Sequence, residues 1–192
     1  MLDRYLGPTF GAIAAFVLEI VQIGVLALAI IIPVRYFLVQ PFIVKGESME
    51  PNFHDSEYLI IDELTFRFRE PIRGEIVVFH PPGANDSQYY IKRVIGLPGE
   101  TVEVKDGNVI IYNEQYPNGQ VLDEAYLDEY TPGRDRRVVG LDEYYLMGDN
   151  RDASLDSRAF GTVPKGNVVG RVWIRGLPIE KLGTFALPEY NQ

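Results

Sequence analysis

The chain has 192 residues, which suits one domain plus an appendage, and 46% of them are hydrophobic, enough to bury a core. Its 18 basic and 27 acidic residues give a formal net charge of −9, which argues against nucleic acid as a partner because phosphate binding needs clustered positive charge. The absence of cysteine excludes disulfides and a cysteine nucleophile, and with only two histidines, His54 and His80, we expect no multi-histidine metal site.

A long apolar run follows a short N-terminal tail at residues 1–9. From Phe10 to Val34 the sequence contains one charge, Glu19, and one amide, Gln22. As a helix this run would span roughly 37 Å, more than the bilayer core of about 30 Å, and it has no polar stripe of the kind that a core-facing helix shows. We therefore expect residues 10–38 to form a single transmembrane anchor.

A cleavable signal peptide is the alternative interpretation of this run, because Ala27 to Ala29 offers a small-x-small site. The apolar sequence continues through Ile32, however, which is too long for an ordinary signal-peptide core. The flanking charges leave the orientation open, since Arg4 and the terminal amine on one side are balanced by Arg35 and Lys45 on the other.

Residues 39–192 show short apolar runs separated by turn signals, the pattern of a mainly β domain. Within the run Thr101 to Asn113, the pair Asp106-Gly107 tolerates the positive φ of a type I′ turn, which predicts a hairpin. Further strands are predicted within Glu57 to Leu64, Gly74 to His80, Tyr89 to Gly96 and Gly166 to Gly176.

Two stretches of this domain are less regular. The charged, turn-rich sequence Val121 to Gly140 is interpreted as a solvated insertion rather than a core element, within an excursion of about residues 114–140. The segment Leu64 to Glu70 alternates Phe66 and Phe68 with arginines. This alternation fits either aromatic side chains at a lipid interface or the ordinary amphipathicity of a strand.

A candidate nucleophile lies in "VKGESMEPNFHD", Val44 to Asp55, where turn-forming residues surround Ser48. A serine hydroxyl is a poor nucleophile until a base takes its proton. The two histidines have the sequence context of surface loops, and the chain has no G-x-S-x-G elbow.

Lysine is the next candidate base. In "YYIKRVIG", alternation puts Lys92 and Arg93 on opposite faces, so one of these cations points into apolar surroundings if the strand is central. Burial lowers the pKa of a lysine and makes it a competent general base. Taken alone, such a pair is more often a solvated strand face.

A third block, "MGDNRDASLDSRAFG" from Met147 to Gly161, concentrates aspartates, serines and arginines in one loop. Ordinary turns have this composition too. In this block Asp156 and Arg158 are suited to a charge-assisted pair. A serine, Ser154 or Ser157, would then hold a neutral lysine amine toward Ser48.

Four elements, "GESMEPNF", "RGEIVVF", "KRVIGLPGE" and "GDNRDASLDSR", stand in this order after the apolar run. Together they resemble type I signal peptidases, the membrane-anchored Ser/Lys proteases that remove signal peptides from exported proteins. The resemblance extends over about Phe10 to Arg175. It implies a signal-peptidase-like antiparallel β-barrel or sandwich domain on the extracytoplasmic side of the cell membrane, carried by one transmembrane helix.

By position, the resemblance implies that Ser48 is the nucleophile and Lys92 the general base. It also implies that Ser154 orients the lysine amine and that Asp156 and Arg158 form a supporting ion pair. The implied partners are the lipid bilayer and preproteins with small residues, typically alanine, one and three positions before the cut. No metal and no cofactor is implied.

Two further positions follow from the resemblance. Asp149 would structure the same loop as the supporting pair. Gly46 is a departure, because Gram-negative members have a serine there whose hydroxyl contributes to the oxyanion hole. The backbone N–H of Ser48 is the expected first donor, and the second donor stays open. Loss of one such donor costs about 2.7–4 kcal/mol of transition-state stabilisation.

Two rival functions are weighed against this prediction. A self-cleaving Ser/Lys regulator of the repressor type shares the dyad, but it would carry a DNA-binding domain, whereas this chain is acidic and has an apolar anchor. A membrane-tethered β domain that only binds would have Ser48 and Lys92 by chance, and it would be indifferent to Ser48→Ala.

Overall fold

The computed structural model describes residues 8–37, 39–85, 87–127 and 129–190. Contacts between residues divide the chain into two units, Met1–Val39 and Gln40–Gln192. The expected N-terminal tail at residues 1–9 lies largely outside the described residues, which begin at Pro8.

The first unit contains one long helix, α2 (Pro8–Phe37). Its stretch Gly11–Ile32 has a mean hydropathy of 2.6, and its apolar side chains are exposed. A helix that is apolar all round and covered by no protein is typical of a membrane span. The structure thus confirms the predicted N-terminal apolar helix, which fits a transmembrane anchor.

The second unit is mainly antiparallel β structure, as predicted. One sheet has the strand order β1-β2-β11-β3-β4-β9-β10, with β12 beside β11. Its strands are β1 (Val39–Ile43), β2 (Tyr58–Asp62), β3 (Ile76–Phe79), β4 (Tyr90–Gly96), β9 (Glu143–Met147), β10 (Val163–Pro164), β11 (Val168–Leu177) and β12 (Gly183–Thr184).

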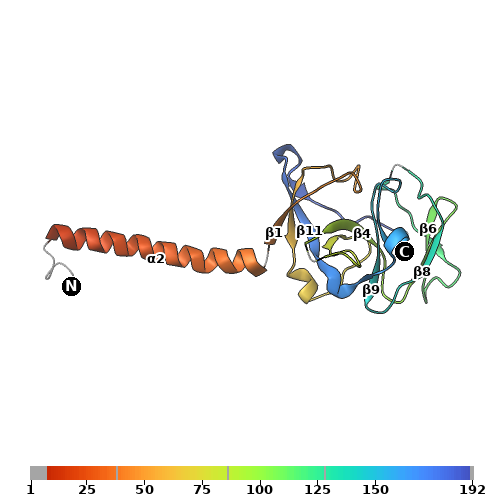
Figure 1. The fold of residues 1–192 in the computed structure, drawn as a ribbon, viewed down its shortest axis with the longest axis horizontal. Coiled ribbons are helices and arrows are strands. Elements are labelled where there is room, and N and C mark those ends of the chain that lie inside the picture. Colours follow the sequence, from red (N-terminus) through yellow and green to blue (C-terminus); the bar gives the residue numbers. More distant parts are fainter. Residues whose placement is uncertain (1–7, 38, 86, 128, 191–192) are drawn as a thin grey trace. The chain divides into compact units, whose positions relative to one another are not determined.

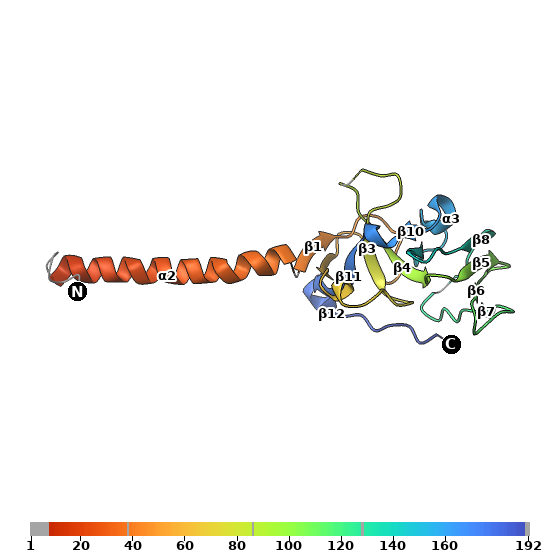
Figure 2. The same ribbon diagram turned by 90° about the horizontal axis from the view of Figure 1, so that it is seen from below.

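A second sheet of four strands has the order β7-β6-β5-β8. It consists of β5 (Thr101–Lys105), β6 (Asn108–Tyr112), β7 (Gln120–Val121) and β8 (Asp135–Val138). The predicted hairpin is confirmed: β5 pairs with β6, and the turn residues Asp106 and Gly107 have φ of 51° and 85°. This sheet lies at one end of the unit, while β1 and β12 lie at the other (Figures 1 and 2).

Short helices connect the strands of the second unit. They are η1 (Thr65–Arg67), α3 (Ser157–Phe160), η2 (Lys165–Asn167) and η3 (Ile179–Lys181). The segment Leu64 to Glu70 therefore contains a 3₁₀ turn rather than a strand, because the Asp62 carboxylate accepts hydrogen bonds from the backbone N–H groups of Leu64 and Thr65. Phe66 packs against the core, whereas Phe68 is 82% exposed.

The interpretation of Val121 to Gly140 as a solvated insertion is wrong for several of its residues. Strand β8 pairs with β5, and β7 pairs with β6. Leu122 and Val139 are buried in the same cluster as Ile111, because the small second sheet needs apolar side chains from its edge segments to close its core. High charge in the sequence concealed these two core positions.

We predict that Ile111→Ala lowers the free energy of unfolding by about 2–5 kcal/mol, since the Ile111 side chain is fully buried. The neighbouring Ile110 is only half-buried, so Ile110→Ala serves as the control and should cost less. Chemical denaturation of the detergent-solubilised protein, followed by circular dichroism, measures both. Equal losses for the two variants would contradict the assigned packing of this sheet.

Candidate active site

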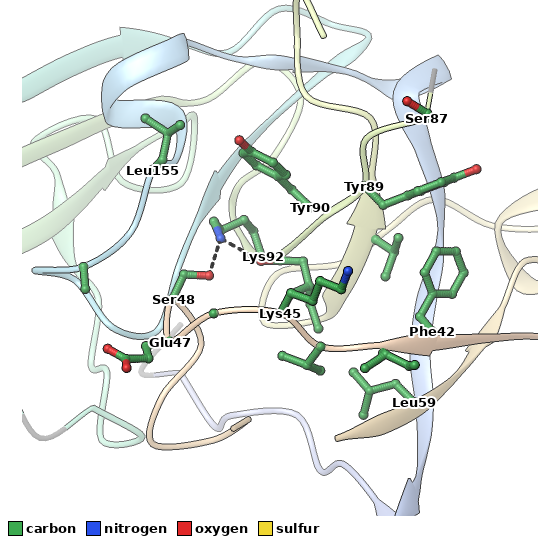
Figure 3. A pocket seen from close by; sticks show the side chains of 16 residues that line it. Phe42, Lys45, Glu47, Ser48, Leu59, Ser87, Tyr89, Tyr90, Lys92 and Leu155 are labelled. Atoms are coloured by element: carbon green, nitrogen blue, oxygen red, sulfur yellow. Dashed lines mark hydrogen bonds between the residues drawn. The ribbon is translucent and has the colours of Figure 1, made fainter. Parts of the chain in front are cut away.

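Ser48 and Lys92 are brought into contact by elements 44 residues apart in sequence. Ser48 lies in a tight turn after β1, where Phe53 N–H donates to the Met49 carbonyl, and both of these side chains are buried. Lys92 projects from β4. Its Nζ lies 2.7 Å from Ser48 Oγ. A dashed line joins the two labelled side chains in Figure 3.

Lys92 is held in a position that disfavours its charge. Strand β4 lies between β3 and β9, and Lys92 is only 3% exposed. Burial lowers its pKa from 10.5 to about 8, although the negative charges of Asp156 and Asp149 act in the opposite direction. Besides Ser48, the amine donates to the Ile91 carbonyl at 2.9 Å.

The adjacent cation, Arg93, is also buried, but it has a partner for its charge. Its Nε and Nη2 donate to the carboxylate of Asp149 at 2.8 and 2.5 Å, and its Nη1 donates to the Gly74 carbonyl. Its guanidinium also stacks 4.1 Å from the ring centre of Tyr126. The strand therefore buries both cations, one paired with a carboxylate and one in contact with a hydroxyl.

The loop after β9 supplies the supporting charges. Asp156 caps helix α3 and forms an ion pair with Arg158, at 2.8 Å from Nη2 to Oδ2. Burial acts to raise the pKa of Asp156, but the hydrogen bonds and charge of Arg158 outweigh it, and the pKa is lowered. Ser157 instead accepts a hydrogen bond from the backbone N–H of Leu146.

Ser154 is placed differently from the expectation. Its hydroxyl is buried beside Asp156 and Gly148, and within the described residues it makes no hydrogen bond to Lys92. The contacts of the amine are with Ser48 and the Ile91 carbonyl. In this structure the partners of the lysine amine therefore do not include Ser154, whose hydroxyl lies beside the Asp156 carboxylate.

Gly148 is where the two loops meet. A Cβ added to Gly148 would lie 2.2 Å from Ser154 Oγ and 2.4 Å from the Ser48 carbonyl oxygen, far closer than van der Waals contact allows. The same carbonyl accepts a hydrogen bond from the backbone N–H of Asn150 at 3.1 Å. Asn52, in the Ser48 turn, donates to Asp149 Oδ2 at 2.9 Å. These contacts fix the position of Ser48.

The dyad opens into a cavity of about 570 Å³. The segment Phe42–Ser48 forms one wall and Tyr89–Lys92 forms another, and both segments are drawn in Figure 3. Further lining comes from Leu59, Val78, Ser87, Ala153 and Leu155. Apolar side chains such as Phe42 and Leu59 line part of this cavity, and the polar side chains of Lys45, Glu47 and Ser87 line the rest. The apolar part, with a nucleophile at its edge, is suited to small apolar side chains.

Gly46 lines this cavity but its amide is engaged elsewhere. The residue has a φ of 87°, which favours glycine, and its N–H donates to Asp55 Oδ1 at 2.8 Å. That hydrogen bond, followed by one from Ser56, lowers the pKa of Asp55. Gly46 therefore shapes the turn and does not direct an N–H at the dyad.

Sequence reasoning did not find three residues that hold the site: Asn52, Asp55 and Gly148. No sequence signal marks their contacts, because each depends on how two distant loops approach. The sequence also gives no sign of a metal centre, and the described ranges contain no group of three or more carboxylate or imidazole side chains arranged to hold a metal ion.

Comparisons with known proteins show which family the chain resembles. The sequence model of the family described as "Signal peptidase, peptidase S26" matches residues 17–176. The chain is 39% identical to a probable signal peptidase I-2 of Synechocystis, covering 86% of this chain and 76% of the relative. It is 37% identical to a signal peptidase I of Leptolyngbya laminosa, covering 85% and 81%.

Proteins from two further organisms are also similar. A signal peptidase IB of Staphylococcus aureus is 34% identical, with 84% of this chain and 90% of the relative covered. A crystal structure of a signal peptidase I from Enterococcus faecalis V583 is 34% identical and covers 54% of this chain and 97% of that chain, with a TM-score of 0.46.

The family model and the relatives from Synechocystis and Leptolyngbya laminosa show that the chain is a serine peptidase, a hydrolase. The chain belongs to the signal peptidase family, peptidase S26.

We predict that Gly148→Ala lowers kcat about 100-fold, because the added methyl group must displace the Ser48 carbonyl, and a shift of about 1 Å at a reacting atom costs this much. Gly166→Ala is the matched control, since a Cβ there meets nothing within 4 Å. Peptide cleavage assays at saturating substrate measure both. An unchanged kcat in folded Gly148→Ala would contradict the close approach of the two loops.

Proposed function

We propose that this chain removes N-terminal signal peptides from exported preproteins, using Ser48 as nucleophile and Lys92 as general base. The single observation that carries the proposal is the 2.7 Å contact between Lys92 Nζ and Ser48 Oγ at the edge of an apolar cavity. Membership of the signal peptidase family supports the choice of substrate.

The chemistry follows from the protonation state of Lys92. A pKa of about 8 leaves roughly one lysine in eleven neutral at pH 7, against about one in 3,000 at the ordinary value of 10.5. The neutral amine takes the Ser48 proton as Oγ attacks the scissile carbonyl, which gives an acyl-enzyme. The lysinium then protonates the leaving amine, and neutral Lys92 activates the water that hydrolyses the ester.

The supporting residues act through the dyad. The Asp156–Arg158 pair and Asp149 keep the loop behind the dyad in place, and Ser154 packs within that loop. The backbone N–H of Ser48 is our candidate for the first oxyanion donor. Because the Gly46 N–H donates to Asp55, a different group has to supply the second donor.

An extended substrate can bind beside the segment Phe42–Gly46. The N–H and C=O of Val44 bond to Glu57 and Ser56 on the β2 side, so in extended chain those of its neighbours Ile43 and Lys45 point the opposite way, toward the cavity. Pairing of the substrate backbone to this edge would place small side chains, as in Ala-x-Ala sites, in the apolar cavity.

The two units have different roles in this proposal. Residues 10–38 anchor the enzyme in the cell membrane by one span, and residues 39–192 form the catalytic domain on the extracytoplasmic side. The apolar surface of α2 supports the anchor. The family resemblance supports the orientation, since signal peptides are cut after they have been exported.

We predict that Ser48→Ala and Lys92→Ala each abolish cleavage of a preprotein with an Ala-x-Ala site, with losses of at least about 10³-fold, because each removes one half of a unit that acts together. Lys105→Ala, at an exposed position in the β5–β6 hairpin, is the control and should cleave normally. Mass spectrometry of the products locates the cut. Normal cleavage by folded Lys92→Ala would show that another group is the base.

We predict that kcat/KM rises with pH through a midpoint near 8 and is level above it. The reason is that the free enzyme is active only when Lys92 is neutral, and burial has lowered the pKa of Lys92 to about 8. The measurement is the pH dependence of peptide cleavage well below KM. A midpoint near 10.5 would mean that Lys92 is not desolvated in the working enzyme.

A further inference from the structure

The segment after β12 returns along the second unit without regular structure, as Figure 2 shows. Three of its side chains, Phe185, Pro188 and Tyr190, are half-buried, and the residues between them are exposed. We call Phe185–Tyr190 the strap. It lies beyond residues 17–176, over which the family model matches.

The first end of the strap packs behind the turn that carries Ser48. The ring of Phe185 lies 4.5 Å from that of Phe53, centre to centre. The guanidinium of Arg175 lies 5.2 Å from the Phe53 ring and 5.1 Å from the Phe185 ring, and it donates to the backbone carbonyl of Asn52. Phe185 and Arg175 therefore support the far side of the Ser48 turn.

The other end of the strap packs against the surroundings of Arg93. The Tyr190 ring packs edge to face against the Tyr126 ring, with ring centres 6.2 Å apart. The Arg93 guanidinium stacks on the same Tyr126 ring. A Cβ added to Gly74 would lie 2.8 Å from a Pro188 side-chain atom and 3.0 Å from a Tyr190 ring atom, so the strap packs directly on Gly74. The Gly74 carbonyl in turn accepts a hydrogen bond from the Arg93 guanidinium. This end of the strap therefore packs against the residues that contact Arg93, which follows Lys92 on β4.

We propose that the strap is a positioning element of the active site, which holds the Ser48 turn at one end and the Lys92 strand at the other. This proposal rests on the function proposed above. The distance between Ser48 Oγ and Lys92 Nζ depends on those two elements, and the strap contacts the supporting side chains of both. Phe185 and Tyr190 are thus positioning residues, which act through Phe53 and Tyr126.

A strap with this role differs from a simple cover over apolar surface. A cover would contribute to stability alone, so the folded fraction of a variant would turn over substrate at the normal rate. A positioning element changes the geometry of the reacting atoms, and a misplacement of about 1 Å costs about 100-fold in rate. Since the strap does not line the cavity, substrate binding should change little.

The test uses the full chain in detergent and a peptide with an Ala-x-Ala site. We expect Phe185→Ala and Tyr190→Ala each to lower kcat by about tenfold or more, with KM within twofold of the wild type. Tyr190→Phe should restore the normal kcat, because its ring is kept and the two tyrosine hydroxyls are 3.5 Å apart, too far for a strong hydrogen bond. Leu187→Ala, at an exposed position of the strap, is the matched control.

A normal kcat in folded Phe185→Ala and Tyr190→Ala overturns the positioning role of the strap and leaves the proposed function intact. No cleavage by the wild type overturns the proposed function itself. If an alanine variant is unfolded at the assay temperature by circular dichroism, Phe185→Leu and Tyr190→Leu replace it, since they keep most of the apolar volume and lose the ring stacking. A normal kcat in those folded variants also overturns the proposal.

Discussion

The site depends on one constraint: Lys92 is buried on a central strand, and no carboxylate among the described residues is in direct contact with its amine. Water normally stabilises an ammonium group, and its removal favours the neutral amine. The neighbouring Arg93 is also buried, but it keeps its charge because two of its nitrogens donate hydrogen bonds to the Asp149 carboxylate. Two adjacent cations on one strand thus have different chemistry, and only the lysine is available to accept a proton.

The remaining elements keep this arrangement compact. Asp149 joins Arg93 on the strand to Asn52 in the Ser48 turn, so one buried carboxylate links the two halves of the dyad. Gly148 lets the Ser48 carbonyl approach the loop after β9, and Asp156 with Arg158 closes that loop. Removing one partner of such a buried ion pair destabilises the fold, because the remaining charge is buried with neither a partner nor water to stabilise it.

Much of the fold, and the identity of the dyad, could be predicted from the sequence. The apolar helix and the β5–β6 hairpin follow from local patterns, namely a long uncharged run and an Asp-Gly turn. The pairing of Ser48 with Lys92 came from a family resemblance, since no local pattern links residues so far apart. Ser154 was placed on Lys92 by the same resemblance, whereas here its hydroxyl packs beside Asp156. The burial of Leu122 and Val139 was missed because it depends on how the second sheet closes.

The protonation state of Lys92 is the most direct test of this account. Lysine labelled with ¹³C at Cε reports its own titration by NMR, and Lys92→Arg identifies the signal that belongs to this residue. We predict a titration midpoint near pH 8, well below those of the exposed lysines, because burial lowers the pKa of Lys92. A midpoint near 10.5 would mean that the amine is charged when it meets Ser48, and it would contradict the proposed role of Lys92 as general base.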